Sequence, residues 1–174
     1  PRLVLFPNDI KISKSLNKKI KKKIFAITID KAFDQTIRSC ARRKKKHEGT
    51  WLVDEMIEAY TTLHNLGYAH SIETWRDNKL VGGLYGVCLG KSFFGESMFS
   101  FESDASKIAL VMLANHLEKY GFDLIDCQVK TNHLLNMGAI EISRNSFLDI
   151  IHQSVKKKDI PNIWNPDIGI GITI

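Results

Sequence analysis

What the sequence lacks excludes several classes of protein. It has no apolar run near the roughly 20 residues that a helix needs to cross a bilayer, and its longest candidate, Ile108 to Leu113, stops at Asn115 and His116. It also lacks the basic, apolar and small-residue pattern of a secretory signal. The chain starts at Pro1 without a methionine, so we expect a fragment whose upstream sequence is missing. These absences predict a soluble protein with no membrane partner.

Cysteine is scarce. The three cysteines, Cys40, Cys88 and Cys127, are odd in number and widely spaced, so they form neither a disulfide framework nor a redox or zinc motif. This favours a reducing compartment, the cytoplasm. The six histidines show no metal-ligand spacing with cysteine or carboxylate. We therefore predict no metal and no cofactor.

What is present suits one compact domain. The 174 residues are 44% hydrophobic and 25% charged, enough to fill a core and cover a surface. The net charge of +6 and the pI near 9.2 favour an anionic partner, because nucleic acids and acidic membranes both gather on basic surfaces. Charge alone leaves both partners open.

Two basic segments stand out. Ser13 is predicted to cap a helix with Leu16 and Ile20 on one face, and the other positions carry Lys14, Lys18, Lys19, Lys21, Lys22 and Lys23. Residues Arg42 to Lys46 form a run of five cations that predicts a mobile loop, since like charges repel. Each segment fits a solvated surface and a phosphate-contacting surface equally well.

The spacing of apolar residues predicts a mixed α/β (α+β) fold, a mixed sheet with flanking helices. Glycine, proline and capping residues bound the elements. We expect strands at Leu3–Phe6, Phe25–Ile29, Ala69–Trp75, Lys79–Leu89, Leu124–Cys127 and Ala139–Ile142. We expect helices after Ser13, after Asp30, from Asp54, over Asp104–Tyr120, at Asn132–Met137 and at Ser146–His152. Asp30 is expected to cap the second of these helices, and the third is expected to turn Met56, Ala59, Tyr60 and Leu63 inward. Residues 1–158 form the predicted domain, and residues 159–174 are a tail without a recognisable pattern.

The central hairpin is the clearest local prediction. Asp77 and Asn78 join two strands of alternating pattern. Gly82, Gly83 and Gly86 lie inside the second strand, where glycine weakens pairing unless a bulge or a close approach requires it. We therefore expect another part of the molecule to pack against that strand.

Two carboxylates lie in an otherwise apolar stretch. Glu96 and Asp126 fall within Phe93–Gln128, and a carboxylate among apolar residues must be paired, hydrogen-bonded or protonated. A catalytic site and a structural ion pair both fit. Lys107 is among the possible partners of Glu96.

The element order suits an acyltransferase fold of the acetyltransferase type. An enzyme of that type that uses acyl-coenzyme A needs glycine-rich backbone where the central helix starts, so that amides approach the pyrophosphate. Here that helix starts at Phe101, Glu102, Ser103, Asp104 and Ala105. Two carboxylates and no glycine predict that coenzyme A is not the donor.

Short motifs over most of the chain carry a resemblance to a family. They are Gly49-Thr50-Trp51, Glu55-Met56, Ala59-Tyr60, Leu63-His64, Gly67 with Ala69-His70-Ser71, Gly82-Gly83 with Tyr85-Gly86, Gly95 to Ser100, Ala105-Ser106-Lys107, Ile125 to Gln128, and Gly138-Ala139. The chain resembles leucyl/phenylalanyl-tRNA–protein transferase, a bacterial aminoacyltransferase family. The resemblance implies transfer of Leu, Phe or Met from aminoacyl-tRNA to proteins that begin with Arg or Lys, which marks them for degradation. The family also carries a smaller N-terminal domain before the strand at Leu3, with aromatic residues near the tRNA 3′ adenosine.

The resemblance also implies a binding pocket for the transferred side chain. We expect Leu84, Phe93, Leu110, Leu113, Leu117 and Ile125 to line it, although each of these residues also fits an ordinary core. A pocket of that shape favours side chains unbranched at Cβ, since a misfit of one methylene costs ~1–3 kcal/mol. Trp51 and Tyr60 are expected to stack on the terminal adenine or to line the pocket.

The chemistry assigns roles to three polar residues. An α-amine that attacks an ester must be neutral and must lose a proton as the peptide bond forms. We expect Asp126 to accept or relay that proton, or to hold the amine, with Gln128 on the same strand face to orient it. Glu96 is expected to pair with the incoming cationic N-terminus or with its basic side chain. A nucleophilic Cys127 beside His133 is less favoured, because an aminoacyl ester requires no covalent nucleophile.

Two alternatives stay open at this point. One is an acyl-coenzyme A-dependent N-acetyltransferase. The other is a non-catalytic RNA-binding module, which would hold charged and uncharged tRNA equally well.

Overall fold

The fold is a single seven-stranded sheet with helices on both faces. A computed structural model of the chain describes residues 1–42 and 52–166. Its strands are β1 (Arg2–Leu5), β2 (Ala26–Ile29), β3 (Ala69–Arg76), β4 (Lys79–Leu89), β5 (Ser92–Ser100), β6 (Leu124–Gln128) and β7 (Ile140–Ile142). The strand order is β2-β3-β4-β5-β6-β1-β7, and only the β5–β6 pair is parallel within this part of the chain. The predicted mixed α/β fold is confirmed.

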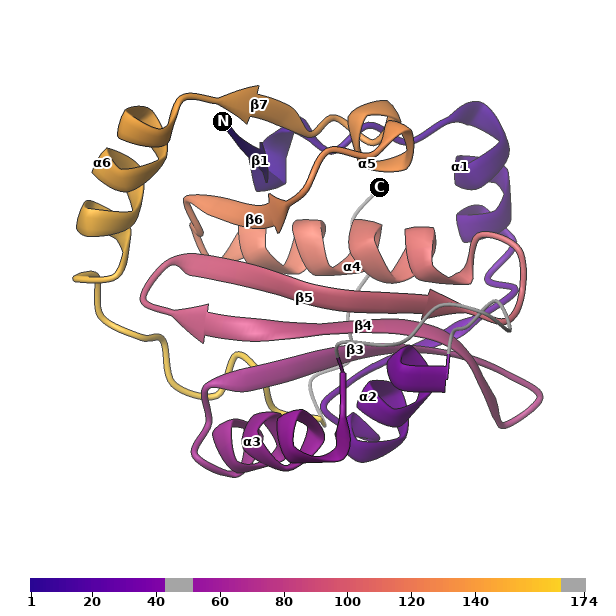
Figure 1. Cartoon of the computed structure of the whole chain (residues 1–174). Coiled ribbons are helices and arrows are strands. Elements are labelled where there is room, and N and C mark those ends of the chain that lie inside the picture. Colours follow the sequence, from indigo (N-terminus) through magenta and orange to yellow (C-terminus); the bar gives the residue numbers. More distant parts are fainter. Residues whose placement is uncertain (43–51, 167–174) are drawn as a thin grey trace.

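The helices are α1 (Lys14–Lys21), α2 (Phe33–Arg42), α3 (Asp54–Asn65), α4 (Ala105–Lys119), α5 (Asn132–Asn136) and α6 (Arg144–Ser154), with a short 3-10 turn at Pro7–Asp9. Figure 1 shows α4 running lengthwise along the sheet, visible between β5 and β6, with α2 and α3 beside β3. No helix in the described part is long and apolar enough to cross a membrane.

The two faces of the sheet have separate cores. Leu84 packs in a cluster with residues of α4, whereas its neighbour Tyr85 packs in a cluster with residues of α2 and α3. This follows from the period-two alternation of a strand. Because both faces of β3 and β4 are covered, most of their residues are buried, including the polar Ser71, Glu73 and Thr74.

Most local predictions hold. The hairpin turns at Asp77 and Asn78, both with positive φ, as a two-residue turn of this kind requires. Ser13 caps α1, since its hydroxyl accepts a hydrogen bond from the Leu16 amide over 3.2 Å. Gly67 and Gly121 follow α3 and α4 with φ of +81° and +66°, the left-handed conformation common after a helix.

Four predictions need correction. Asp30 does not cap α2: its carboxylate accepts hydrogen bonds from His70 and from the Ser71 amide instead. Residues Ser92–Ser100 form strand β5, which the pattern did not reveal. In α3 the fully buried residue is Ile57, whereas Ala59 is exposed. Arg42 is the last residue of α2 rather than part of a loop, and the rest of that cationic run lies outside the described residues.

The glycines of β4 are explained by what packs against them. A Cβ on Gly82 would lie 2.5 Å from the Ala105 Cβ at the start of α4. A Cβ on Gly86 would lie 2.2 Å from the Phe94 carbonyl oxygen and 2.5 Å from the Phe93 ring. The expectation of close approach to this strand is confirmed, and the approaching groups are α4 and β5.

We predict that Gly86→Ala lowers the free energy of unfolding by at least ~2 kcal/mol, because a methyl group there overlaps fixed backbone. The matched control is Gly121→Ala, whose Cβ meets nothing within 4 Å and costs only the ~1 kcal/mol of a left-handed alanine. Urea unfolding followed by far-ultraviolet circular dichroism measures both. Equal losses for the two variants would contradict the packing explanation.

Candidate active site

The candidate site lies where β5 and β6 separate. Their parallel pairing covers only Ser92–Phe94 against Leu124–Asp126, after which β5 continues to Ser100 and β6 ends at Gln128. Each strand carries a bulge beside the separation. On β5, Tyr85 pairs with Ser97 and Gly86 with Gly95, so Glu96 is the extra residue. On β6, Asp126 and Gln128 face successive residues of β1, which leaves Cys127 as the extra residue. Bulges re-aim side chains and commonly lie next to active sites.

A cavity of about 890 Å³ occupies this separation. Its apolar lining includes five of the six residues expected there: Leu84, Phe93, Leu110, Leu113 and Ile125. The three predicted polar residues, Glu96, Asp126 and Gln128, line the same cavity. Leu117 does not line it: it lies on the same face of α4 as Leu110 and Leu113, but a turn farther along the helix, within the core. An apolar recess with a few convergent polar groups is the usual form of a ligand site.

The two predicted aromatic residues have different positions. Tyr60 does not line the cavity itself. Its hydroxyl donates a hydrogen bond to the carboxylate of Glu96, which does. Burial and the neighbouring negative charge of Glu96 raise the pKa of Tyr60, so this hydroxyl keeps its proton and its donor role. Trp51 lies outside the described residues.

Asp126 is fully buried and held by a residue that the sequence analysis missed. The Arg2 Nε donates to the Asp126 Oδ1 at 2.9 Å, and the Arg2 Nη2 donates to its Oδ2 at 2.7 Å. The backbone N–H of Gln128 donates to Oδ1 as well, at 2.9 Å. Both carboxylate oxygens therefore already accept charge-assisted or backbone hydrogen bonds, which hold the Asp126 carboxylate in one place.

Gln128 orients a different carboxylate from the one expected. Its φ is +62°, and with the bulge at Cys127 this breaks the alternation that would place it on the strand face of Asp126. Its side chain amide instead donates to the Gly95 carbonyl at 2.9 Å and approaches the Glu96 Oε2 at 3.4 Å. Gln128 thus ties the two bulged strands together across the separation, beside Glu96.

Among the described residues, Glu96 is the cavity-lining carboxylate without an ion pair. It is partly exposed, and its neighbours are the Tyr60 hydroxyl and the Gln128 amide. The anticipated ion pair with Lys107 is not formed, because Lys107 binds Asp104 at 2.7 Å. The two donors to Glu96 are neutral, and no ion pair with it forms within residues 1–42 and 52–166, so Glu96 is able to bind a positively charged group.

Two further lining residues bear on the chemistry. Tyr85 lines the cavity and its buried hydroxyl has no hydrogen-bond partner among the described residues, so a bound substrate can supply one. Cys127 and His133 also line the cavity, but burial raises the pKa of the Cys127 thiol to about 12. A thiol in that environment is a poor nucleophile.

The start of α4 differs from the expectation of two repelling carboxylates. Asp104 is paired with Lys19 at 2.6 Å as well as with Lys107, and the hydrogen bonds from these lysines lower the pKa of its carboxyl. Glu102 is paired with Arg76 at 2.8 Å. Their charges are offset locally, so electrostatic repulsion of a pyrophosphate is weaker than the sequence suggested.

Comparison with known proteins gives consistent matches. The family model for leucyl/phenylalanyl-tRNA protein transferase matches residues 4–152. A leucyl/phenylalanyl-tRNA–protein transferase of Desulforapulum autotrophicum is 54% identical over 94% of this chain and 72% of its own length. One of Nitrosomonas eutropha is also 54% identical, over 96% of this chain and 71% of its own.

Among solved structures, the chain is similar to an aminoglycoside acetyltransferase from an uncultured soil metagenomic sample. The identity is 16% over 80% of this chain and 93% of that chain, with a TM-score of 0.49. A likeness at this level bears on neither substrate nor mechanism.

We predict that Arg2→Met lowers the free energy of unfolding by ~3 kcal/mol, because it leaves the buried Asp126 carboxylate without its ion-pair partner. Arg38→Met is the matched control: Arg38 pairs with Asp34 at the surface, where both side chains are more than half exposed, so solvent screens the pair and its loss should have little effect on stability. Urea titration of both variants gives the comparison. If Arg2→Met costs no more than Arg38→Met, the pair does not anchor the site.

Proposed function

Since this chain belongs to the leucyl/phenylalanyl-tRNA protein transferase family and is an aminoacyl-tRNA-dependent transferase, we propose that it moves Leu or Phe, and also Met, to the N-terminal amine of proteins that begin with Arg or Lys. The observation that carries this proposal is the cavity at the β5–β6 separation, which joins an apolar recess to an accessible carboxylate. The recess suits an uncharged side chain, and the carboxylate suits a cationic chain end.

The recess receives the side chain of the transferred amino acid in this proposal. Its lining side chains present only carbon atoms and come from β4, β5, β6 and α4: Leu84, Phe93, Ile125, Leu110 and Leu113. Burial of a Leu or Phe side chain against such a surface contributes about 1.5–3 kcal/mol. A charged side chain would lose its hydration there without a partner, so Asp, Glu, Lys and Arg are excluded as transferred residues.

Glu96 holds the acceptor. Its carboxylate is within reach of solvent, is fixed by Tyr60 and Gln128, and binds the α-ammonium group or the basic side chain of the acceptor. This explains an acidic site in a protein of net charge +6. Asp126 acts as a positioning residue: with Arg2 it fixes the backbone of Gln128 and, through Gln128, the place of Glu96.

The reaction needs little more than placement. The α-ammonium group of the acceptor first gives one proton to water. The neutral amine then attacks the ester carbonyl carbon, the C–N bond forms, and the bond from that carbon to the ribose oxygen breaks. The proton lost by the amine passes to the departing ribose oxygen through the neighbouring ribose hydroxyl. An ester is already activated, so holding the amine and the ester in line supplies most of the rate.

The lysines of α1 form the surface proposed for tRNA. Lys14, Lys18, Lys21 and Lys22 are exposed, while Leu16 and Ile20 anchor the helix in the core. Lys19 lies between the helix and the cavity, because it pairs with Asp104, which lines the cavity. An RNA backbone that runs along α1 therefore ends near the recess.

The proposal places the reaction in the cytoplasm and makes the acceptor a target for degradation.

A direct assay tests the proposal. Labelled Leu on tRNA is offered with a peptide that begins with Arg and with the same peptide beginning with Glu. We predict transfer only to the first, and a loss of about 100-fold or more in kcat/KM for Glu96→Gln, which removes the charge that binds and orients the acceptor amine. Glu118→Gln, an exposed change on α4, is the control and keeps the wild-type rate.

Four results would go against the proposal. Equal transfer to the Glu-initial peptide would remove the acceptor assignment, and an unchanged rate in Glu96→Gln would remove the role of that carboxylate. Stabilisation by coenzyme A in a thermal-shift measurement, without transfer from tRNA, would favour an N-acetyltransferase. Equal binding of charged and uncharged tRNA without transfer would favour an RNA-binding module.

We further predict that the double variant Lys18→Glu/Lys22→Glu weakens binding of Leu-tRNA about tenfold or more at moderate salt. The slope of log Kd against the logarithm of the salt concentration should also fall by about 1–2, since each lost phosphate contact removes ~0.7–0.9 from that slope. The control is Lys156→Glu/Lys158→Glu, two exposed lysines after α6 that give the same change in net charge. Identical losses in both double variants would show a general charge effect and not a docking surface.

A further inference from the structure

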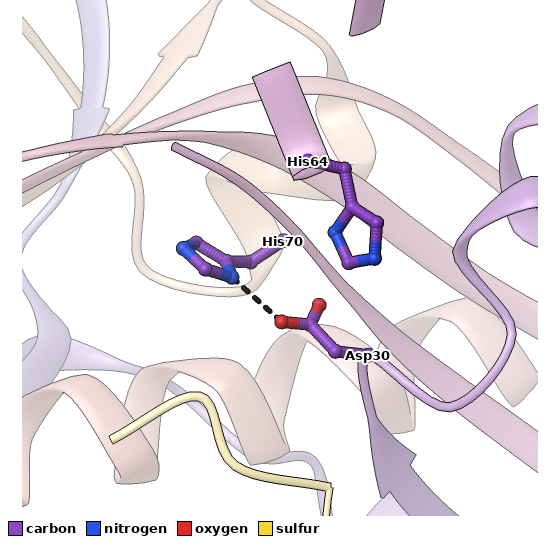
Figure 2. A group of neighbouring side chains, drawn as sticks. All are labelled: Asp30, His64 and His70. Carbon is purple, nitrogen blue, oxygen red and sulfur yellow. Dashed lines mark hydrogen bonds and ion pairs between the residues drawn. The ribbon is translucent and has the colours of Figure 1, made fainter. Parts of the chain in front are cut away.

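Three potential metal ligands meet near the β2 edge of the sheet, beside a second cavity. Asp30 follows β2, His64 lies in the last turn of α3 and His70 lies in β3. One ligand atom of each lies within 4.8 Å of the other two. Figure 2 shows the three side chains converging, with His70 hydrogen-bonded to Asp30. Sequence spacing does not reveal this group, because Asp30 arrives through the β2–β3 pairing.

On each of the three side chains, one polar atom is hydrogen-bonded to a backbone group, and the other is left to face a metal ion. The His64 Nδ1 donates to the Ala69 carbonyl at 2.8 Å and the His70 Nε2 donates to the Gly67 carbonyl at 3.1 Å. A carbonyl only accepts, so these bonds leave the His64 Nε2 and the His70 Nδ1 as the ligand atoms. The Asp30 Oδ1 accepts from the Ser71 amide at 2.7 Å, which leaves Oδ2. Metal-binding histidines and carboxylates are commonly fixed by such bonds.

The three side chains are largely shielded from solvent, but they border a cavity. The side chains of His70 and Asp30 are only 5% and 8% exposed. All three residues border a cavity of about 450 Å³, which residues of the segment 159–166 also line. From that segment, Trp164 stacks on the His70 ring with centroids 4.2 Å apart. The cavity has room for a water molecule as a further ligand.

We propose that Asp30, His64 and His70 bind one divalent transition-metal ion, with Zn²⁺ as the best match. Two imidazole nitrogens, one carboxylate oxygen and one water make a tetrahedral set that suits this ion. The Asp30 Oδ2 and the His70 Nδ1 lie 2.7 Å apart around a shared proton. Two ligands of one tetrahedral Zn²⁺ lie about 3.3 Å apart, so Oδ2 and Nδ1 need to separate by only about 0.6 Å as the ion replaces that proton. The ligand atom of His64 lies within 4.8 Å of both.

The site would stabilise the fold rather than take part in transfer. The two cavities share no lining residue among the described parts of the chain. The ion would join β2, α3 and β3, and through His70 it would also fix the segment that carries Trp164. A metal ion that binds only the folded state stabilises it by mass action.

The test uses Zn²⁺ and Co²⁺ with the whole chain after treatment with a chelator. We expect one Zn²⁺ per chain by equilibrium dialysis, a rise in Tm with Zn²⁺, and the visible absorption of tetrahedral Co²⁺. His64→Gln and Asp30→Asn should each weaken binding by about 100-fold or more and abolish the Co²⁺ spectrum. Asn at position 30 still accepts from the Ser71 amide, so Asp30→Asn preserves the local fold.

The control is His152→Gln, an exposed histidine of α6, which should bind like the wild type. Circular dichroism checks that each variant is folded. Absence of saturable Zn²⁺ binding to the wild-type chain would overturn the proposal and leave a plain His–Asp ion pair. Binding that is undiminished in folded His64→Gln and Asp30→Asn would overturn it as well.

Discussion

The ion pair between Arg2 and Asp126 is the contact on which the candidate site depends. It links the second residue of the chain to β6 across 124 positions, at the point where β6 leaves β5. Asp126 is completely buried, so this pairing offsets the cost of removing its charge from water. The same carboxylate accepts from the Gln128 amide, which sets the backbone from which Gln128 reaches Glu96. Strand separation, cavity and accessible carboxylate therefore share one anchor.

Local patterns predicted much of the fold, because the signals that shape each element lie within it. The hairpin follows from Asp77 and Asn78, and α4 follows from a wide apolar face bounded by Gly121. Strand β5 was missed because Gly95, Glu96 and Ser97 interrupt its apolar pattern, and the interruption is the bulge itself. Asp30 was assigned as a cap because its real partners, His70 and Ser71, lie some 40 residues away in sequence.

The candidate site was predictable in composition but not in its internal bonds. Glu96, Asp126 and Gln128 share one cavity with five of the six apolar residues expected there. Sequence could not assign Arg2 to Asp126, since an arginine beside a short strand carries no mark of its distant partner. Alternation also placed Gln128 beside Asp126, whereas the bulge at Cys127 and a positive φ direct its side chain toward Glu96. Leu117 shows that a helix face continues beyond the part that borders a cavity.

The bulge at Glu96 also limits how this chain can vary in length. Side chains of a strand alternate between its two faces, so loss of the extra residue would restore a regular ladder and exchange the faces of every residue on one side of the break. Phe99 would then turn from the core of α2 and α3 toward α4, and Met98 would turn the opposite way. Single-residue insertions and deletions between Gly95 and Ser97 should accordingly be absent from functional descendants of this chain, even where substitutions in the surrounding strand are tolerated.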